Sequence, residues 1–332
     1  MRPFVPIVSN PHLLTIAGNY WPRNLDFERF PTQTRVFDTA PGVRILVHSH
    51  QPDRTRRGDV VLVHGLEGSS DAGYLQSAAQ AVLTAGFAAH RMNLRSCGGT
   101  EAWSGDTLYH SGLTSDLRAV LEALRDEGRG PLYVAGYSLG GNVSLKLAGE
   151  LGRQGQTLLE GVCAISTPID LAACVETLAW RQNFLYARRF LSRLKQRILV
   201  KNQLRPGLFA VERLPDVRSI YDFDDVFTAP SFGFGTAANY YATQSANRFL
   251  DGIRVPTLLV QAKDDPLIPF RVFDHPSLRR NPSLRFLATN HGGHLGYLSR
   301  RKPRFWLDET MVEWLRNPGN RAARVFVSVT DR

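Results

Sequence analysis

The clearest chemical signal in the chain is a serine inside a glycine-rich turn. The run Gly-Tyr-Ser-Leu-Gly-Gly surrounds Ser138 and matches the pattern G-x-S-x-G. The apolar residues before it predict a strand, Leu132–Ala135, and the residues after it predict a helix, Asn142–Leu151. A serine on such a tight turn adopts a strained backbone, and Gly136 and Gly140 remove the collisions that side chains would cause. In this context the pattern predicts a nucleophile.

A serine hydroxyl is a weak nucleophile, so it needs a base, and the base needs an acid that orients it. Two adjacent aspartates, Asp264 and Asp265, follow one apolar run, and two histidines, His291 and His294, follow the next. This chain order, Ser then Asp then His, is one of the known orders of such triads. The spacing leaves both choices open, since either aspartate can be the acid and either histidine the base. The residue types predict acyl transfer through a covalent intermediate.

A third requirement is a pair of N–H groups that hold the developing oxyanion. The run His-Gly-Leu-Glu-Gly at 64–68 follows an apolar segment, and we expect the backbone N–H of Leu66 to be one donor and that of Leu139 the other. One such donor typically contributes about 3–4 kcal/mol of transition-state stabilisation. Glu67 and Asp71 are interpreted as a loop carboxylate and a helix N-terminal carboxylate, not as catalytic acids.

The elements that must position these groups alternate between strands and helices. Apolar runs predict strands at 60–63, 87–93, 132–135, 162–166, 257–261 and 284–288, and helical spacing predicts helices at 75–84, 115–125 and 142–151. Continuous apolar strands are typical of a parallel sheet that is covered on both faces. The fold class is therefore α/β, a mostly parallel central sheet flanked by helices. The candidate residues follow the carboxyl ends of strands, where such sheets bind ligands.

The strand–helix alternation stops between Leu171 and Leu250, where no strand-like run occurs. We interpret this stretch as a helical insertion above the ligand crevice. The predicted organisation is an N-terminal part of the core at 1–170, a helical cap at 171–250 and a C-terminal part of the core at 251–332.

The charge is concentrated in the predicted cap. The chain has 40 Lys and Arg against 30 Asp and Glu, and nine of the basic residues fall between 181 and 213, where Glu212 is the sole acid. Arg189, Arg193, Arg197 and Lys201 recur at every fourth position. A basic amphipathic helix can contact an anionic membrane. We favour a cap helix with its apolar side on the crevice and its arginines in solvent. The sequence has a basic segment but no motif that would indicate nucleic-acid binding.

Composition excludes several classes of protein. The 332 residues are 43% hydrophobic, which is enough for a large core. The three cysteines, without a CxxC pair, exclude a disulfide framework and a four-cysteine zinc site. The first residues are broken by prolines and lack a signal-peptide core, and no run approaches the ~20 apolar residues of a transmembrane helix. We expect a soluble, cytoplasmic protein.

Six ordered motifs resemble a known family. They are Asn-Pro-His-Leu-Leu-Thr at 10–15, HGLEG at 64–68, NLRSCGG at 93–99, GYSLGGN at 136–142, DDPLIP at 264–269 and HGGHLGY at 291–297. Together they resemble the YheT-like branch of α/β hydrolases, also called the AB hydrolase 4 family, from Asn10 to Trp314. The chain departs from the usual family pattern at Ser96, where Gly is usual, and at Leu14, where Gln is common.

The resemblance implies the α/β-hydrolase fold with Asp265 as the acid and His294 as the base. It also implies carboxylic ester hydrolase or acylglycerol lipase activity on a small-molecule or lipid ester, with no metal or organic cofactor. Some members are acyltransferases, so transfer to an alcohol is one alternative, and a non-catalytic lipid-binding protein of the same fold is another. The membrane anchor that larger members carry before the first motif is expected to be absent.

Overall fold

The strands divide their side chains between two apolar layers. In β3 (Asp59–Val63), Val61 and Val63 belong to one buried cluster, whereas Val60 and Leu62 belong to another. Successive side chains of a strand point to opposite faces, so both faces of the sheet are covered. The computed structural model describes residues 2–318.

Eight strands form the sheet, in the spatial order β1-β2-β4-β3-β5-β6-β7-β8. Besides β3 they are β1 (Gln33–Ala40), β2 (Val43–His50), β4 (Ala88–Met92), β5 (Leu132–Tyr137), β6 (Gly161–Ile165), β7 (Thr257–Ala262) and β8 (Leu284–Thr289). In this spatial order, all neighbouring strands from β4 through β3 to β8 pair in parallel. This confirms the predicted fold class, a mostly parallel sheet flanked by helices.

The sequence pattern missed the antiparallel hairpin β1–β2 at the edge of the sheet. Its strands pair antiparallel with each other, and β2 also pairs antiparallel with β4. Most residues of β1 are exposed or half-buried, because an edge strand has no neighbouring strand on one side. Polar residues interrupt both runs, so neither reads as the continuous apolar strand of a parallel sheet.

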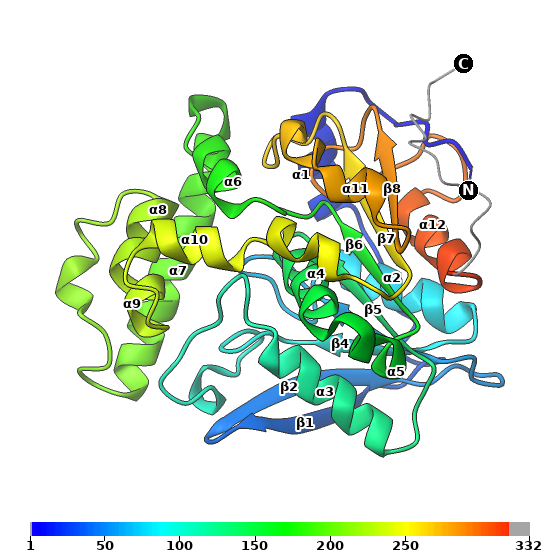
Figure 1. Ribbon diagram of the computed structural model, residues 1–332, viewed down its shortest axis with the longest axis horizontal. Helices are drawn as coiled ribbons and strands as arrows, with labels where there is room; N and C mark the ends of the chain where they lie inside the picture. Colours follow the sequence, from blue (N-terminus) through cyan, green and yellow to red (C-terminus); the bar gives the residue numbers. More distant parts are fainter. Residues whose placement is uncertain (1, 319–332) are drawn as a thin grey trace.

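Helices cover the two faces of the sheet (Figure 1). Buried residues of α3 (Ser115–Asp126) and α4 (Leu139–Leu151) join one apolar cluster, and those of α2 (Gly73–Thr84) and α12 (Trp306–Leu315) join the other. The shorter helices of the core are α1 (Pro11–Tyr20), α5 (Gly155–Leu158) and α11 (Pro276–Arg280). Short helical turns are η1 (Glu101–Trp103), η2 (Gly152–Gln154) and η7 (Phe270–Phe273).

The segment between β6 and β7 contains helices and no strand, and lies beside the core in Figure 1. Its helices are α6 (Leu171–Leu178), α7 (Phe184–Leu204), α8 (Ile220–Phe223), α9 (Ala229–Ser231) and α10 (Ala237–Gln244). Its turns are η3 (Arg181–Asn183), η4 (Val211–Arg213), the π-helical η5 (Asp224–Thr228) and η6 (Ala246–Gly252). We use the word cap for residues 171–250, and their division from the core as a separate unit stays a prediction.

Three cysteines are buried and unpaired, and burial raises the pKa of the Cys97 thiol to about 12. Such thiols are poor nucleophiles, since the reactive species is the thiolate. In the part of the chain that the structure describes, no helix combines the length and the apolar character needed to span a bilayer. The cytoplasmic location stays a prediction.

Candidate active site

Ser138 occupies the turn between β5 and α4 with a strained backbone. Its φ of 52° and ψ of −121° lie outside the regions that a residue with a side chain ordinarily adopts. The helix begins at Leu139, three residues earlier than predicted, because Gly140 and Gly141 form its first turn despite their low helix propensity. The amino end of α4 therefore directs its partial positive charge at Ser138.

The turn also lies very close to the loop that follows β3. A Cβ atom on Gly140 would lie 2.6 Å from the carbonyl oxygen of His64, so only glycine fits there. On the other side, a Cβ on Gly65 would lie 3.0 Å from Cβ of Ser138. These contacts place the HGLEG loop against the serine, as is needed for the loop to donate to an oxyanion there.

A continuous relay of hydrogen bonds joins three distant segments. The Ser138 Oγ atom lies 3.0 Å from His294 Nε2, and His294 Nδ1 lies 2.9 Å from Asp265 Oδ2. The Asp265 carboxylate is fully buried, and its Oδ1 atom accepts hydrogen bonds from the backbone N–H groups of Leu267 and Ile268. Because the carboxylate accepts from Nδ1, Nε2 is left to accept the serine proton.

The neighbouring aspartate and histidine form a second pair. His291 Nδ1 lies 3.2 Å from Asp264 Oδ2, and Asp264 Oδ1 accepts a hydrogen bond from Gly293 N. Burial raises the pKa of Asp264, partly offset by these donors. Of the alternatives that spacing left open, the structure brings Asp265 and His294 to the serine and uses Asp264 and His291 to hold the histidine loop.

Helix α1 supports the histidine from the other side. Asn10 caps this helix by accepting from Leu13 N, and Pro11 occupies its first turn, as helix starts favour. The Thr15 hydroxyl donates to the Pro11 carbonyl at 2.7 Å and accepts from His294 N at 2.8 Å. The first motif of the chain therefore fixes the backbone of the histidine that faces the serine.

The predicted oxyanion donors lie beside Ser138. Leu66 and Leu139 both line the cavity that contains the serine. Among residues 2–318, neither backbone N–H donates to another protein group. His64 holds the loop, because its Nε2 accepts from Leu94 N and its Nδ1 bonds the Gly65 carbonyl. Burial lowers the pKa of His64 to about 4, so this imidazole is neutral at pH 7.

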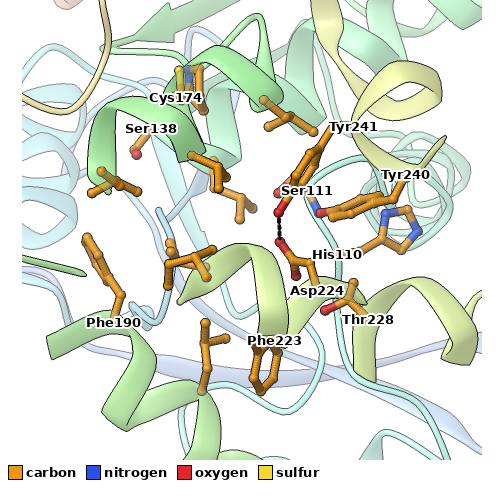
Figure 2. Close-up of a pocket in the computed structure, with 18 of the residues that line it drawn as sticks. His110, Ser111, Ser138, Cys174, Phe190, Phe223, Asp224, Thr228, Tyr240 and Tyr241 are labelled. Atoms are coloured by element: carbon orange, nitrogen blue, oxygen red, sulfur yellow. Dashed lines mark hydrogen bonds between the residues drawn. The ribbon is translucent and has the colours of Figure 1, made fainter. Parts of the chain in front are cut away.

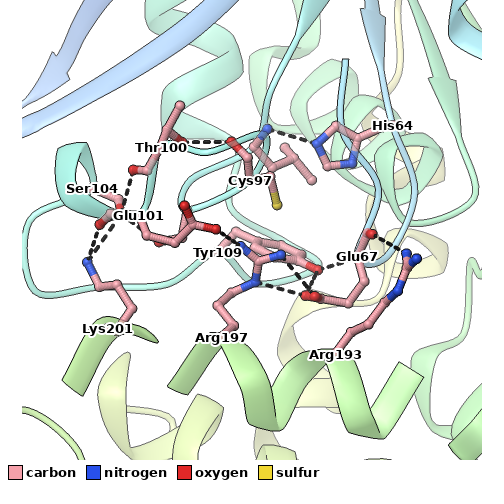
Figure 3. A network of polar contacts seen from close by, with 12 residues as sticks. His64, Glu67, Cys97, Thr100, Glu101, Ser104, Tyr109, Arg193, Arg197 and Lys201 are labelled. Atoms are coloured by element: carbon pink, nitrogen blue, oxygen red, sulfur yellow. Dashed lines mark hydrogen bonds and ion pairs between the residues drawn. The ribbon is translucent and has the colours of Figure 1, made fainter. Parts of the chain in front are cut away.

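Glu67, next to Leu66, is tied to the cap (Figure 3). Arg197 of α7 donates to both Glu67 oxygens, at 3.1 and 2.9 Å, and lies 3.3 Å from a Glu101 oxygen. The Tyr109 hydroxyl bonds both the backbone N–H and the carboxylate of Glu67, and Arg193 donates to its carbonyl. Glu67 itself has φ +54°, so this network stabilises a loop with a strained residue.

The arrangement corrects the expectation for the basic stripe. Arg189 and Arg193 are exposed, as expected of side chains in solvent. That expectation is wrong for Arg197, whose guanidinium lies against the carboxylates of Glu67 and Glu101. Lys201, the last member of the stripe, is buried as well. The Lys201 ammonium bonds the carbonyls of Glu101 and Gly105, and its residue is 2% exposed. Half of the stripe is therefore unavailable to a membrane surface, and Glu67 is an ion-pair partner rather than a simple loop carboxylate.

A largely apolar cavity opens beside the serine, with about 890 Å³ of empty space that is partly continuous with solvent (Figure 2). Ser138, His294 and both predicted oxyanion residues line it, together with apolar side chains from the cap and from the Leu267–Ile268 turn. The cap residues among them include Leu171, Leu178, Phe190, Leu194, Ile220 and Phe223.

Several residues around the site were missed by the sequence reasoning. Thr15, Tyr109 and Arg197 act through contacts between segments far apart in the chain, and Asp224 accepts a hydrogen bond from Tyr241, 17 residues later. The acidic Glu67 in the HGLEG loop and the excess of cations in the cap were the sequence signals from which their ion pair could have been inferred. In the described part of the chain, no group of three or more His, Cys, Asp or Glu side chains is arranged to hold a metal ion.

Comparisons with known proteins agree with this architecture. A family model described as serine aminopeptidase, S33, matches residues 54–275. The YheT protein of Escherichia coli (strain K12), whose name carries a proposed esterase activity, is 32% identical over 94% of this chain and 92% of its own length. The monoacylglycerol lipase of Saccharomyces cerevisiae is 28% identical over 89% of this chain and 68% of its own.

Among solved structures, the Pyrococcus furiosus esterase Pf2001 superposes with a TM-score of 0.57 over 95% of this chain and 98% of that one, at 16% identity. A likeness at that identity shows a shared fold alone. The family match and the extent of the likeness to YheT decide the assignment: the chain belongs to the α/β-hydrolase superfamily, in its YheT-like branch.

Proposed function

We propose that this protein is a serine hydrolase of carboxylic esters, with Ser138 as nucleophile, His294 as general base and Asp265 as the acid that orients it. The observation that carries the proposal is the relay from Ser138 Oγ through His294 to Asp265, with spans of 3.0 and 2.9 Å. The strained backbone of Ser138 supports it, because strain of this kind is typical of functional turns. The esterase and lipase names of the relatives point to the same substrate class.

In the proposed reaction, Ser138 Oγ attacks the ester carbonyl carbon while its proton passes to His294 Nε2. The carbonyl oxygen becomes an oxyanion, which accepts hydrogen bonds from the N–H groups of Leu66 and Leu139. Asp265 stabilises the imidazolium and keeps its ring in place. The tetrahedral intermediate then expels the alcohol, which takes its proton from His294.

Deacylation repeats these steps with water. His294 removes a proton from a water molecule that attacks the acyl carbon, and the tetrahedral intermediate expels the Ser138 oxygen, which regains the proton. The acid product leaves and the free serine returns. The side chains and backbone of this chain provide the nucleophile, the base, the acid and the oxyanion donors for these steps.

The lining of the cavity favours a lipid-derived or medium-chain acyl group. Apolar walls stabilise a bound alkyl chain by about 25 cal/mol for each Å² removed from water. The acyl group stays bonded to Ser138 in the intermediate, and Ser138 lines this cavity. A second hollow, between α1 and α7, also reaches His294 but not Ser138, and suits the leaving alcohol.

The test is hydrolysis of p-nitrophenyl acyl esters by wild type and by Ser138→Ala. We expect the substitution to abolish detectable turnover. Ser144→Ala is the matched control, since that hydroxyl is buried six residues away and donates to the Gly140 carbonyl. Full activity in Ser138→Ala would contradict the proposal. Transfer to an alcohol shares the same acyl-enzyme, so product analysis with added glycerol distinguishes an acyltransferase from a hydrolase.

A further inference from the structure

The cavity beside Ser138 is not apolar throughout. One part of its wall gathers polar groups from three segments: the loop before α3, the π-helical turn η5 and helix α10 (Figure 2). These residues are His110, Ser111, Asp224, Thr228, Tyr240 and Tyr241. A site that held only an alkyl chain would gain nothing from them, because burying polar groups costs free energy unless they find partners.

Asp224 is the acceptor at the centre of this polar wall. The Tyr241 hydroxyl donates to its Oδ2 atom at 2.6 Å, and the Thr228 hydroxyl also stabilises its charged form. No Lys, Arg or His forms an ion pair with Asp224 in the part of the chain described. Arg197, which lines the same cavity, is already bound to Glu67 and Glu101.

The carboxylate has unused capacity for hydrogen bonds. Its two oxygens offer about four acceptor positions, whereas two side-chain hydroxyls approach it. Burial raises the pKa of Asp224 to about 6, since the donors around it do not fully replace water. A half-buried acid with few partners at a substrate cavity is satisfied when the ligand brings a donor.

The surroundings favour a hydroxyl over an ammonium group as that donor. The Tyr240 hydroxyl accepts a hydrogen bond from Ser111 N, and a phenol can donate its own proton to an oxygen as well. A hydroxyl both donates and accepts, and so matches an acid and a phenol that lie together. An ammonium group donates only, so it would leave the Tyr240 proton without an acceptor.

We propose that the polar wall around Asp224 is a hydroxyl-binding subsite, so that the protein selects acyl esters whose chain carries a hydroxyl group remote from the scissile bond. This inference rests on the proposed function and names its substrate class. The acyl chain passes from Ser138 along the apolar residues, and its distal hydroxyl donates to Asp224.

The test compares p-nitrophenyl esters of straight-chain acids with those of the corresponding ω-hydroxy acids, from four to twelve carbons. The readout is the ratio of kcat/KM, hydroxy ester over plain ester. We expect this ratio to peak at one chain length in wild type and to fall there by about tenfold or more in Asp224→Leu, because the hydroxyl loses a charged acceptor. Asp224→Asn keeps the shape of the side chain and is expected to lower the ratio by a smaller factor.

Asp225→Asn is the matched control, because this neighbouring carboxylate accepts from Ala237 N and does not line the cavity. A purely structural role for Asp224 would change the rates of both esters together and leave their ratio constant. A constant ratio across wild type and both Asp224 variants, with plain esters still hydrolysed, would overturn the inference alone.

Two further arms separate other outcomes. Ethyl and 2-hydroxyethyl esters of one acid place the hydroxyl on the alcohol side, where we expect no dependence on Asp224, and a dependence confined to that side would overturn the inference. A preference for ω-amino over ω-hydroxy esters would also overturn it. If wild type hydrolyses no ester of either series, the proposed function itself fails, and the inference fails with it.

Discussion

Arg197 of the cap donates two charge-assisted hydrogen bonds, of 3.1 and 2.9 Å, to the carboxylate of Glu67. Glu67 directly follows Leu66, a proposed oxyanion donor. The Arg197 and Glu67 side chains are 10% and 2% exposed, and they lie 130 residues apart in the chain. The cap therefore contacts the loop proposed to hold the oxyanion, and it also lines the cavity.

Breaking this contact is expected to affect stability and turnover together. Arg197→Met leaves the Glu67 carboxylate buried without its main partner, which costs about 3–5 kcal/mol. We expect a lower Tm and, well below that Tm, a kcat reduced at least about tenfold with a smaller change in KM, because displacement of one oxyanion donor acts on the transition state.

The double variant Arg197→Met with Glu67→Gln provides the control. It removes both charges, so its Tm is expected to recover part of the loss while kcat stays low. A folded Arg197→Met protein with wild-type kcat would show that the ion pair has no influence on the oxyanion loop.

The two adjacent aspartates are expected to differ sharply in their effect on turnover. Asp265→Asn presents an amide to His294 and disfavours the tautomer that accepts the serine proton, so kcat is expected to fall by about 10³–10⁴. Asp264→Asn disturbs only the support of the histidine loop, so its loss is expected to stay within about tenfold. Esterase assays on both purified variants make the comparison. Equal losses would contradict the assignment of Asp265.

Thr15 is expected to act through the position of His294. Thr15→Val keeps the shape of the side chain but leaves the His294 N–H without its acceptor, which costs about 1–3 kcal/mol. We predict about a tenfold decrease in kcat with a small change in KM. Thr157→Val, whose hydroxyl bonds the Gln154 carbonyl on an exposed turn, is the matched control. Unaltered kcat in Thr15→Val would show that α1 is not needed to hold the histidine.

Asp224 is expected to make the folded protein less stable toward unfolding as pH rises. Burial raises its pKa to about 6, against an ordinary value of 3.8, so the folded protein keeps a proton that the unfolded chain releases between about pH 4 and 6. The contribution of this acid to the free energy of unfolding therefore falls as pH rises through that window. The amide of the Asp224→Asn variant cannot titrate, so the stability of this variant relative to wild type is expected to rise by about 1 kcal/mol between pH 5 and pH 8.

Urea unfolding of both proteins at the two pH values measures this difference. The same relative stability at both would mean that Asp224 titrates as it does in the unfolded chain.

The sequence was enough to predict the parallel core and the turn that presents the serine. Glycine spacing around Ser138 specifies a tight turn, and continuous apolar runs specify buried strands, because both signals are local. Spacing could not decide between Asp264 and Asp265, since the direction of a side chain in a loop depends on which N–H groups it meets. In the structure, the Leu267 and Ile268 N–H groups anchor Asp265. The family resemblance selected Asp265 and His294, the two residues that the structure brings to the serine.

The sequence pattern could not predict contacts between distant segments. The periodicity of α7 shows a basic stripe but does not say which surface it meets, so it predicts the arginines of the stripe in solvent. Their burial depends on Glu67, Glu101 and the carbonyls of a loop about 100 residues earlier in the chain. The polar wall around Asp224 was hidden for the same reason, because the loop before α3 meets η5 and α10 there, more than 100 residues later in the chain.

The central claim is most directly tested by covalent labelling with a fluorophosphonate, followed by mass spectrometry of the labelled peptide. The account predicts one adduct, on the Ser138 oxygen, that forms rapidly in wild type, slowly in His294→Gln and not at all in Ser138→Ala. A folded wild-type protein that remains unlabelled, or that carries the adduct on another residue, would contradict it.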